Sequence, residues 1–239
     1  MNSSKTTARI VGVLFIIATG APILTHFFIG FLGGEIAGEP VPDYLTRVSA
    51  QETQVLIGMF VELFWALAVV GIPVMLYPIL RKHNEALALG FFGLRFIEAL
   101  STIVVSISLL TLLTLSQEFV QAGAPDASYY LTQGTLLLAV RDWAFMIGSG
   151  LFWSLSALVL NFILYQSKLI PRWLSGWGFI GAILSFVTYL LQFFSINLGD
   201  ILFLPIALQE MVFAVWLIVK GFDSFVIASW SASSGMNNA

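Results

Sequence analysis

Four ionisable residues stand inside stretches of the sequence that are otherwise apolar. Arg95 and Glu98 share the stretch GFFGLRFIEAL, Glu62 stands in GMFVELFWAL, and Glu210 stands in PIALQEMVF. A guanidinium group binds anionic groups, and a carboxyl group takes up and releases protons, so these residue types suit ligand binding and proton exchange. Arg95, Glu98, Glu210 and Glu62 are therefore the candidate ligand-binding or proton-binding residues of the chain.

The composition indicates the environment of these residues. The 239 residues are 59% hydrophobic and only 10% charged, whereas about a quarter of the residues in soluble domains are charged. The formal net charge of −3 and the lack of a basic stripe argue against nucleic acid as a partner. Without cysteine the chain can form no disulfide, and it has no thiolate that could act as a nucleophile or bind a metal. The sequence therefore predicts an all-α integral membrane protein whose partner is membrane lipid.

Apolar runs of roughly 20 residues, the length that crosses a bilayer as a helix, recur along the chain. They predict a bundle of six transmembrane helices at residues 8–32, 55–80, 86–115, 143–165, 173–194 and 201–219. Residues 125–142 are interpreted as a helix continuous with the fourth span. We expect one transmembrane domain over residues 1–220, followed by a cytoplasmic tail over residues 221–239. That tail is rich in small and polar residues, so it is predicted to be largely disordered.

The basic residues of the connections predict the orientation of the bundle. The side that holds both termini carries Lys5, Arg9, Arg81, Lys82, Lys168, Arg172 and Lys220, and the other side carries Arg47 and, at its boundary, Arg141. By the positive-inside rule, both termini are cytoplasmic. Arg141, Asp142 and Trp143 are interpreted as an interfacial group at the outer surface, where an exposed ion pair costs little.

The spacing of the four candidate residues predicts that they face the interior of the bundle. Arg95 and Glu98 are three residues apart and share one helix face, and a charge near the bilayer centre costs a few kcal/mol. A rise of about 1.5 Å per residue puts Glu98 and Glu210 within one helical turn of the same depth. Arg95 lies slightly toward the cytoplasm and Glu62 slightly outward. Because one arginine faces three carboxyl groups, we expect Glu98 to stay ionised beside Arg95 and Glu210 to exchange protons.

Three prolines interrupt the predicted spans. Pro22, Pro73 and Pro205 each remove a backbone donor, and the carbonyl exposed in the preceding turn must be satisfied by a neighbour, a hydroxyl or water. We expect kinks at these positions. Because Pro205 lies just over one turn before Glu210, its kink favours a polar site in the interior.

Three stretches give the chain a family resemblance. ARIVGVLFIIATGAPILTHFF in the first span, GLRFIEAL in the third and IPRWLSGWGFIGAIL at the start of the fifth resemble the bacterial membrane family known as domain of unknown function 4386. The resemblance implies a multi-pass protein with six helices in the bacterial cell (plasma) membrane. Arg95 and Glu98 match an arginine and an acidic position typical of that family. The resemblance implies no catalytic residue and no mechanism.

Motifs of familiar catalytic sites are missing from the sequence. Its two histidines, His26 and His83, are too few for a three-histidine zinc site. There is no Gly-x-Ser-x-Gly nucleophile elbow, no phosphate-binding loop and no dinucleotide fingerprint. We therefore expect neither a metal nor a cofactor.

Three functions remain open at this stage. The first is binding or transport of a small molecule, with Arg95 holding an anionic group and the glutamates coupling protons. The second is a structural or accessory role in which Arg95 forms a buried ion-pair latch with Glu98 or Glu210. The third is an intramembrane enzyme, which is the least favoured because no nucleophile or metal accompanies the carboxyl groups. A water-accessible cavity that reaches Glu210 favours the first, and a dry, tightly paired cluster favours the second. The sequence identifies no protein partner.

Overall fold

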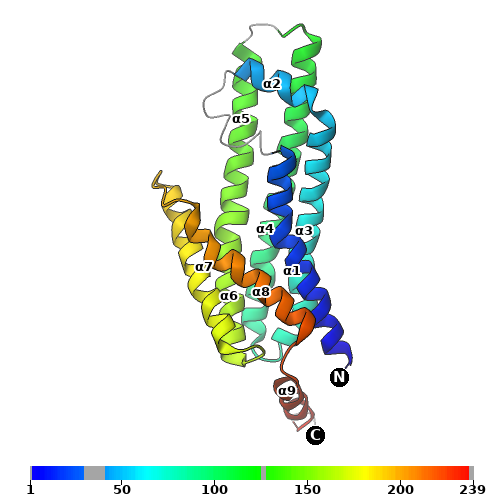
Figure 1. Ribbon diagram of the computed structural model, residues 1–239, viewed down its shortest axis with the longest axis vertical. Helices are drawn as coiled ribbons and strands as arrows, with labels where there is room; N and C mark the ends of the chain where they lie inside the picture. Colours follow the sequence, from blue (N-terminus) through cyan, green and yellow to red (C-terminus); the bar gives the residue numbers. More distant parts are fainter. Residues whose placement is uncertain (1, 30–40, 125–127, 237–239) are drawn as a thin grey trace.

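The computed structural model describes residues 2–29, 41–124 and 128–236, and their regular structure is helical (Figure 1). Six helical stretches are long and apolar enough to cross a membrane. They are α1 (Asn2–Ile29), α3 (Glu52–Leu80), α4 (Glu85–Gln121), the continuous run of α5 (Ser128–Phe145), the π-helix η3 (Met146–Phe152) and α6 (Trp153–Ser167), α7 (Arg172–Gln192), and the 3-10 turn η4 (Asp200–Phe203) with α8 (Leu204–Val219). The predicted multi-pass helical bundle is thus confirmed.

The predicted spans agree with these helices apart from some of their ends. Residues 125–142 were interpreted as a continuation of the fourth span, and the structure has one uninterrupted helical run from α5 to α6. The third span extends further than predicted, since α4 ends at Gln121. The predicted end of the first span, at residue 32, lies outside the described residues.

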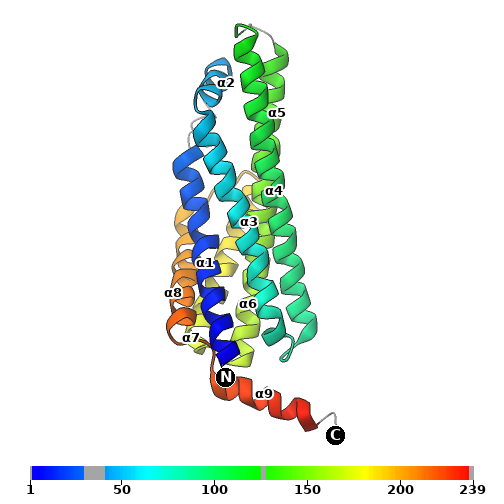
Figure 2. The ribbon, with the colours of Figure 1, turned by 90° about the vertical axis from the view of Figure 1, so that its right-hand side faces the viewer.

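Both termini lie at the same end of the bundle, as an even number of crossings requires (Figure 1). The turn between α3 and α4 and the turn between α6 and α7 lie at this end too. Together with the two terminal segments, this end carries seven of the ten lysine and arginine residues: Lys5, Arg9, Arg81, Lys82, Lys168, Arg172 and Lys220. The opposite end is formed by the far ends of α4 and α5 and by α2 (Val41–Ala50) (Figure 2).

The long helix α4 projects together with α5 at the α2 end (Figure 2). Its 37 residues correspond to about 55 Å, more than the roughly 30 Å of a hydrocarbon core. Here α2 packs against α4 and α5 through Tyr44, Leu45 and Val48, which are fully buried. Burial of this apolar face holds α2 against the projecting ends of α4 and α5.

Local sequence explains where α4 and α8 begin, and the start of α8 overturns one prediction about the prolines. Asn84 caps α4, because its side chain accepts a hydrogen bond from the Leu87 backbone N–H at 3.0 Å. Pro22 and Pro73 lie inside α1 and α3, as predicted. The prediction of a kink at Pro205 was wrong, because Pro205 lies in the first turn of α8. In a first turn the missing N–H has no intrahelical partner to lose.

The tail differs from the sequence interpretation, which expected disorder after residue 220. Residues Ser224–Met236 form helix α9, which crosses the end of the bundle at a steep angle to the long helices (Figure 2). The ring of Trp230 stacks on His83 of the α3–α4 turn with centroids 5.7 Å apart. Residues 237–239 lie outside the described part of the chain.

Candidate functional site

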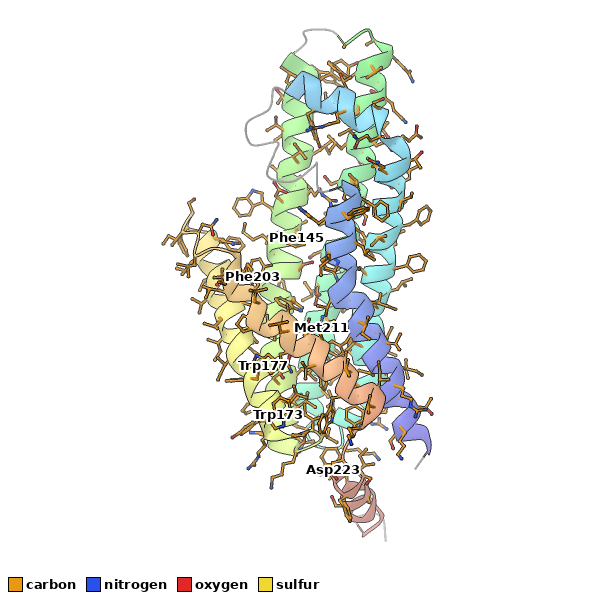
Figure 3. All side chains as sticks on the ribbon, viewed as in Figure 1. Phe145, Trp173, Trp177, Phe203, Met211 and Asp223 are labelled. Atoms are coloured by element: carbon orange, nitrogen blue, oxygen red, sulfur yellow. The ribbon has the colours of Figure 1, made fainter. Side chains whose placement is uncertain are left out.

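A cavity of about 220 Å³ lies inside the bundle and reaches three of the four predicted residues. We call it the inner cavity. Its polar lining comes from Thr19, Arg95, Glu98, Ser149 and Glu210. Most of the exposed surface inside it is apolar, and its aromatic lining comes from Trp65, Phe145, Trp153, Tyr189 and Phe203. Figure 3 places Phe145 and Phe203 near the middle of the molecule, far from Trp173 at the end with the basic turns.

Arg95 is almost completely buried, with 2% of its surface exposed. Its Nη1 donates hydrogen bonds to both carboxylate oxygens of Glu98, at 3.3 and 3.2 Å. The rings of Phe15 and Phe91 each have their centroid 5.8 Å from the guanidinium carbon. Cation–π contacts of this kind stabilise a desolvated cation, so two rings and one carboxylate hold the guanidinium in place.

The other edge of the Arg95 guanidinium is less well paired. Its Nη2 lies 3.8 Å from Oε1 of Glu210, a distance that makes an ion pair but no hydrogen bond. Its Nε has no hydrogen-bond partner among the described residues. Nε–H and one Nη–H of an arginine form a planar fork that matches the two oxygens of a carboxylate. Arg95 lines the inner cavity, and within the described residues this edge of its guanidinium makes no hydrogen bond.

Glu210 is fixed by hydrogen bonds from two other helices. The Thr19 hydroxyl, on α1, donates to Oε2 at 2.8 Å, and Trp153 Nε1–H, on α6, donates to Oε1 at 3.2 Å. The side chain is buried, and α8 carries it. The carboxyl group of Glu210 is therefore placed opposite Arg95 without depending on that arginine for its position.

The π-helix η3 forms part of the wall of the inner cavity. A Cβ atom added to Gly148 would collide with Ser101 on α4, so this glycine lets η3 approach α4 close to Glu98. The next residue, Ser149, lines the inner cavity, and within the described part of the chain its buried hydroxyl has no hydrogen-bond partner. Thr102, in contrast, donates to the Glu98 carbonyl one turn back, at 3.1 Å. π-helical turns occur frequently at functional sites.

The structure separates Glu62 from the other three predicted residues. Glu62 accepts hydrogen bonds from both terminal nitrogens of Arg141 and from the Ser106 hydroxyl, the last at 2.9 Å. The expectation that Arg95 faces three carboxyl groups was therefore wrong, and it faces Glu98 and Glu210. The interpretation of Arg141 as part of an exposed interfacial group was wrong as well, because its side chain reaches inward to a glutamate that is 1% exposed.

Several residues of the site were not singled out from the sequence. Thr19, Ser149 and Trp153 belong to residue types that are common in membrane helices, and no spacing links them to Glu210. A signal for Arg141 did exist: the apolar run TLLLAV before it predicts a helix that continues into the fourth span. A basic residue inside a continuous helix requires an acidic partner at a similar depth, and Glu62 was the candidate on the outer side.

Comparison with known proteins assigns the chain to a family. The model of the family described as "Domain of unknown function (DUF4386)" matches residues 10–221. The chain belongs to the DUF4386 family. The matched region includes five spans of this DUF4386 protein in full, the first span from residue 10 onward and all four predicted site residues, and the match confirms the resemblance noted in the sequence. No curated protein and no solved structure matches the chain. The activity of this DUF4386 protein must therefore be inferred from its own geometry.

Proposed function

We propose that the protein binds a small organic acid in the inner cavity and transports it together with a proton. The observation that carries this proposal is the buried guanidinium of Arg95, whose Nε has no hydrogen-bond partner among the described residues and which lines the inner cavity together with Glu210. In this assignment Arg95 holds the carboxylate of the ligand. Glu98 keeps the guanidinium in place from the opposite edge.

Charge balance explains why a proton accompanies the ligand. Moving a further anion into a buried site is costly unless its charge is compensated. When a carboxylic acid enters, its O–H bond breaks, the carboxylate pairs with Arg95, and the proton passes to Glu210. The net charge of the site is then the same before and after binding. Glu210 can leave Arg95 without losing its place, because Thr19 and Trp153 also hold it.

The cavity limits the size and the chemistry of the ligand. Its volume of about 220 Å³ corresponds to roughly seven water molecules at ~30 Å³ each. Aromatic rings form much of the wall, and they suit an apolar body attached to the carboxylate. A small aliphatic or aromatic monocarboxylic acid fits both features.

A structural latch is the second candidate, and one observation favours it. Arg95 is enclosed by Phe15 and Phe91 and bonded to Glu98, as in an ion pair that fixes helix order. The two candidates differ in whether water reaches the inner cavity. A latch needs no water, whereas a binding site must exchange solvent for ligand.

We infer that the protein works in the plasma membrane of a bacterium with both termini in the cytoplasm. The basic residues gather in the connections at the end that holds the termini, which supports this orientation. In this orientation the α2 end faces away from the cytoplasm.

Cysteine labelling tests whether the inner cavity is hydrated. The chain has no cysteine, so Ser149→Cys provides a single thiol in the cavity wall and Ser185→Cys a matched control. Both serines are buried, and neither hydroxyl has a partner among the residues described, but Ser185 does not line the inner cavity. A small water-soluble methanethiosulfonate should modify Ser149→Cys at least tenfold faster than Ser185→Cys. Equal, slow rates would favour the latch.

Ligand stabilisation tests the chemical assignment. The melting temperature of the purified protein in detergent is measured with acetate, butyrate and benzoate, each compared with its amide. At least one acid should raise the melting temperature while its amide does not, because ligand binding stabilises the folded state. Arg95→Lys keeps the charge but lacks the planar fork, so it should lose the effect. An acid that stabilises Arg95→Lys as strongly as the unchanged protein contradicts the assigned role of Arg95.

A further inference from the structure

A second polar cavity lies next to the inner one, toward the α2 end of the bundle. This outer cavity has a volume of about 200 Å³ and is formed by α1, α3, α4 and α5. Its polar lining consists of Thr25, His26, Glu62, Arg141 and Asp142. His26 and Asp142 are exposed, so the outer cavity opens to the outside of the bundle. The Glu62–Arg141 ion pair, which the function proposed above does not use, is part of its wall.

Each cavity contains a buried hydroxyl that needs a partner. Thr25, 8% exposed, lines the outer cavity, and Ser149, 6% exposed, lines the inner one. Neither hydroxyl makes a hydrogen bond within the described ranges, although Thr111, Thr114 and Ser116 all donate to a backbone carbonyl one turn earlier. A polar group buried without a partner costs free energy, and a cavity of this size with several polar side chains in its wall has room for water. Both cavities are therefore suited to hold water.

Three residues line both cavities and separate them. They are Pro22 on α1, Trp65 on α3 and Phe145 at the end of α5, and we call them the partition. The ring centroids of Trp65 and Phe145 lie 6.2 Å apart, with the ring planes inclined by 56°. Removal of the Phe145 ring would take away a wall that the two cavities share.

Phe145 is the part of the partition best placed to move. Trp65 is 5% exposed, whereas Phe145 is 38% exposed, so Phe145 is the less tightly enclosed of the two rings. Phe145 is also the last residue before the π-helix η3, where the backbone hydrogen-bond pattern changes. Rotation of this one side chain therefore requires no repacking of the buried core.

We infer that the outer cavity is the access chamber of the inner site and that Phe145 is the gate between them. Water and the small organic acid enter from the α2 end, pass the Glu62–Arg141 pair and reach Arg95 when the Phe145 ring turns away from Trp65. The inference rests on the proposed function for the identity of the inner site. It adds a second site, a route and a gating residue.

Labelling of two single cysteines in purified protein tests the gate. Thr25→Cys reports on the outer cavity and Ser149→Cys on the inner one. Each is combined with Phe145→Ala, with Phe145→Trp, or with Trp143→Ala as the control. Trp143 lies two residues from Phe145, contacts Phe193 and lines neither cavity, so its removal takes away an aromatic ring without touching the partition.

The expected pattern is specific to the inner cysteine. Phe145→Ala should speed the labelling of Ser149→Cys at least fivefold, and Phe145→Trp should slow it. The labelling of Thr25→Cys should change less than twofold, and Trp143→Ala should leave both rates unchanged. Phe145→Leu replaces Phe145→Ala if the alanine variant gives no folded protein.

The failure of the gate can be told apart from the failure of the proposed function. If Ser149→Cys is inert in the otherwise unchanged protein and stays inert in Phe145→Ala, the inner cavity is dry and both inferences fail. If Ser149→Cys reacts at the same rate with Phe145, alanine, leucine or tryptophan at position 145, the inner site stands and the gate is overturned. An equal acceleration of Thr25→Cys and Ser149→Cys would also overturn the gate, because it indicates general loosening.

Discussion

Nη2 of Arg95 and Oε1 of Glu210 lie 3.8 Å apart, too far for a hydrogen bond, although both side chains are buried. The same oxygen of Glu210 accepts a hydrogen bond from Trp153 at 3.2 Å. Arg95 is bonded instead to Glu98. The two glutamates therefore differ in their contacts with the arginine: Glu98 accepts hydrogen bonds from it, whereas Glu210 faces it without a hydrogen bond.

Removal of Arg95 should destabilise the protein more than removal of either glutamate. Arg95→Ala leaves Glu98 without a cation and opens space between Phe15 and Phe91, and breaking a buried pair costs about 3–5 kcal/mol. Glu210→Gln should cost less, because the amide oxygen can still accept from Trp153 Nε1–H while the amide NH2 donates to the Thr19 hydroxyl. Melting temperature and folded yield in detergent measure the difference. A melting temperature of Arg95→Ala equal to that of the unchanged protein would show that the ion pair adds no stability.

The Glu62–Arg141 pair should behave as a unit independent of Arg95. A double-mutant cycle with Glu62→Gln and Arg141→Gln should give a coupling free energy of about 0.5–3 kcal/mol, the range for residues in direct contact. The corresponding cycle with Glu62→Gln and Glu98→Gln should give less than about 0.5 kcal/mol, because these residues share no partner. Unfolding in denaturant supplies both values. Strong coupling in the second cycle contradicts the separation of the two clusters.

Much of this architecture could be predicted from the sequence, because the bilayer dictates the length of each apolar run and the rise per residue gives depth along a helix. Depth alone placed Arg95, Glu98 and Glu210 near one level, and the structure brings these three together. The depth of a residue along its helix does not determine which neighbouring helix it faces. Glu62 therefore was grouped with Arg95, although it faces Arg141 on the other long helix.

The finer parts of the site depend on contacts between helices that are distant in the sequence. Trp153 and Thr19 reach Glu210 from α6 and α1, and no periodicity in either helix indicates this. The π-helix η3 contains two glycines and a serine, but small residues are common in membrane helices, so its composition does not indicate a changed hydrogen-bond pattern.

Reporter fusions should place both termini on the cytoplasmic side of the membrane. A C-terminal fusion to alkaline phosphatase, which is active only outside the cytoplasm, should be silent, and a fusion to green fluorescent protein should fluoresce. The basic residues in the connections at the termini support this orientation. A fusion inserted between residues 124 and 128, at the opposite end, should give the reverse pattern and serves as the control. Phosphatase activity at the C-terminus would reverse the assigned direction of the access route.

The close contact between Gly148 and Ser101 should determine how firmly η3 is held against α4. Gly148→Ala adds a Cβ where Ser101 already lies, so the two helices must separate beside Glu98. Forcing extra atoms into a packed contact costs typically about 1–3 kcal/mol. The melting temperature of Gly148→Ala in detergent should therefore fall.

A second substitution separates this contact from a general effect of replacing glycine. Ser101→Gly removes the opposing Cβ, so the double variant Gly148→Ala with Ser101→Gly should recover a large part of the lost melting temperature. Gly90→Ala is the matched control, because Gly90 also lies in a span and its added Cβ would meet nothing within 4 Å. That variant should be unchanged or more stable by about 0.4–1 kcal/mol, since alanine restricts the unfolded chain. If Ser101→Gly fails to rescue Gly148→Ala, the distance between η3 and α4 is set by other contacts.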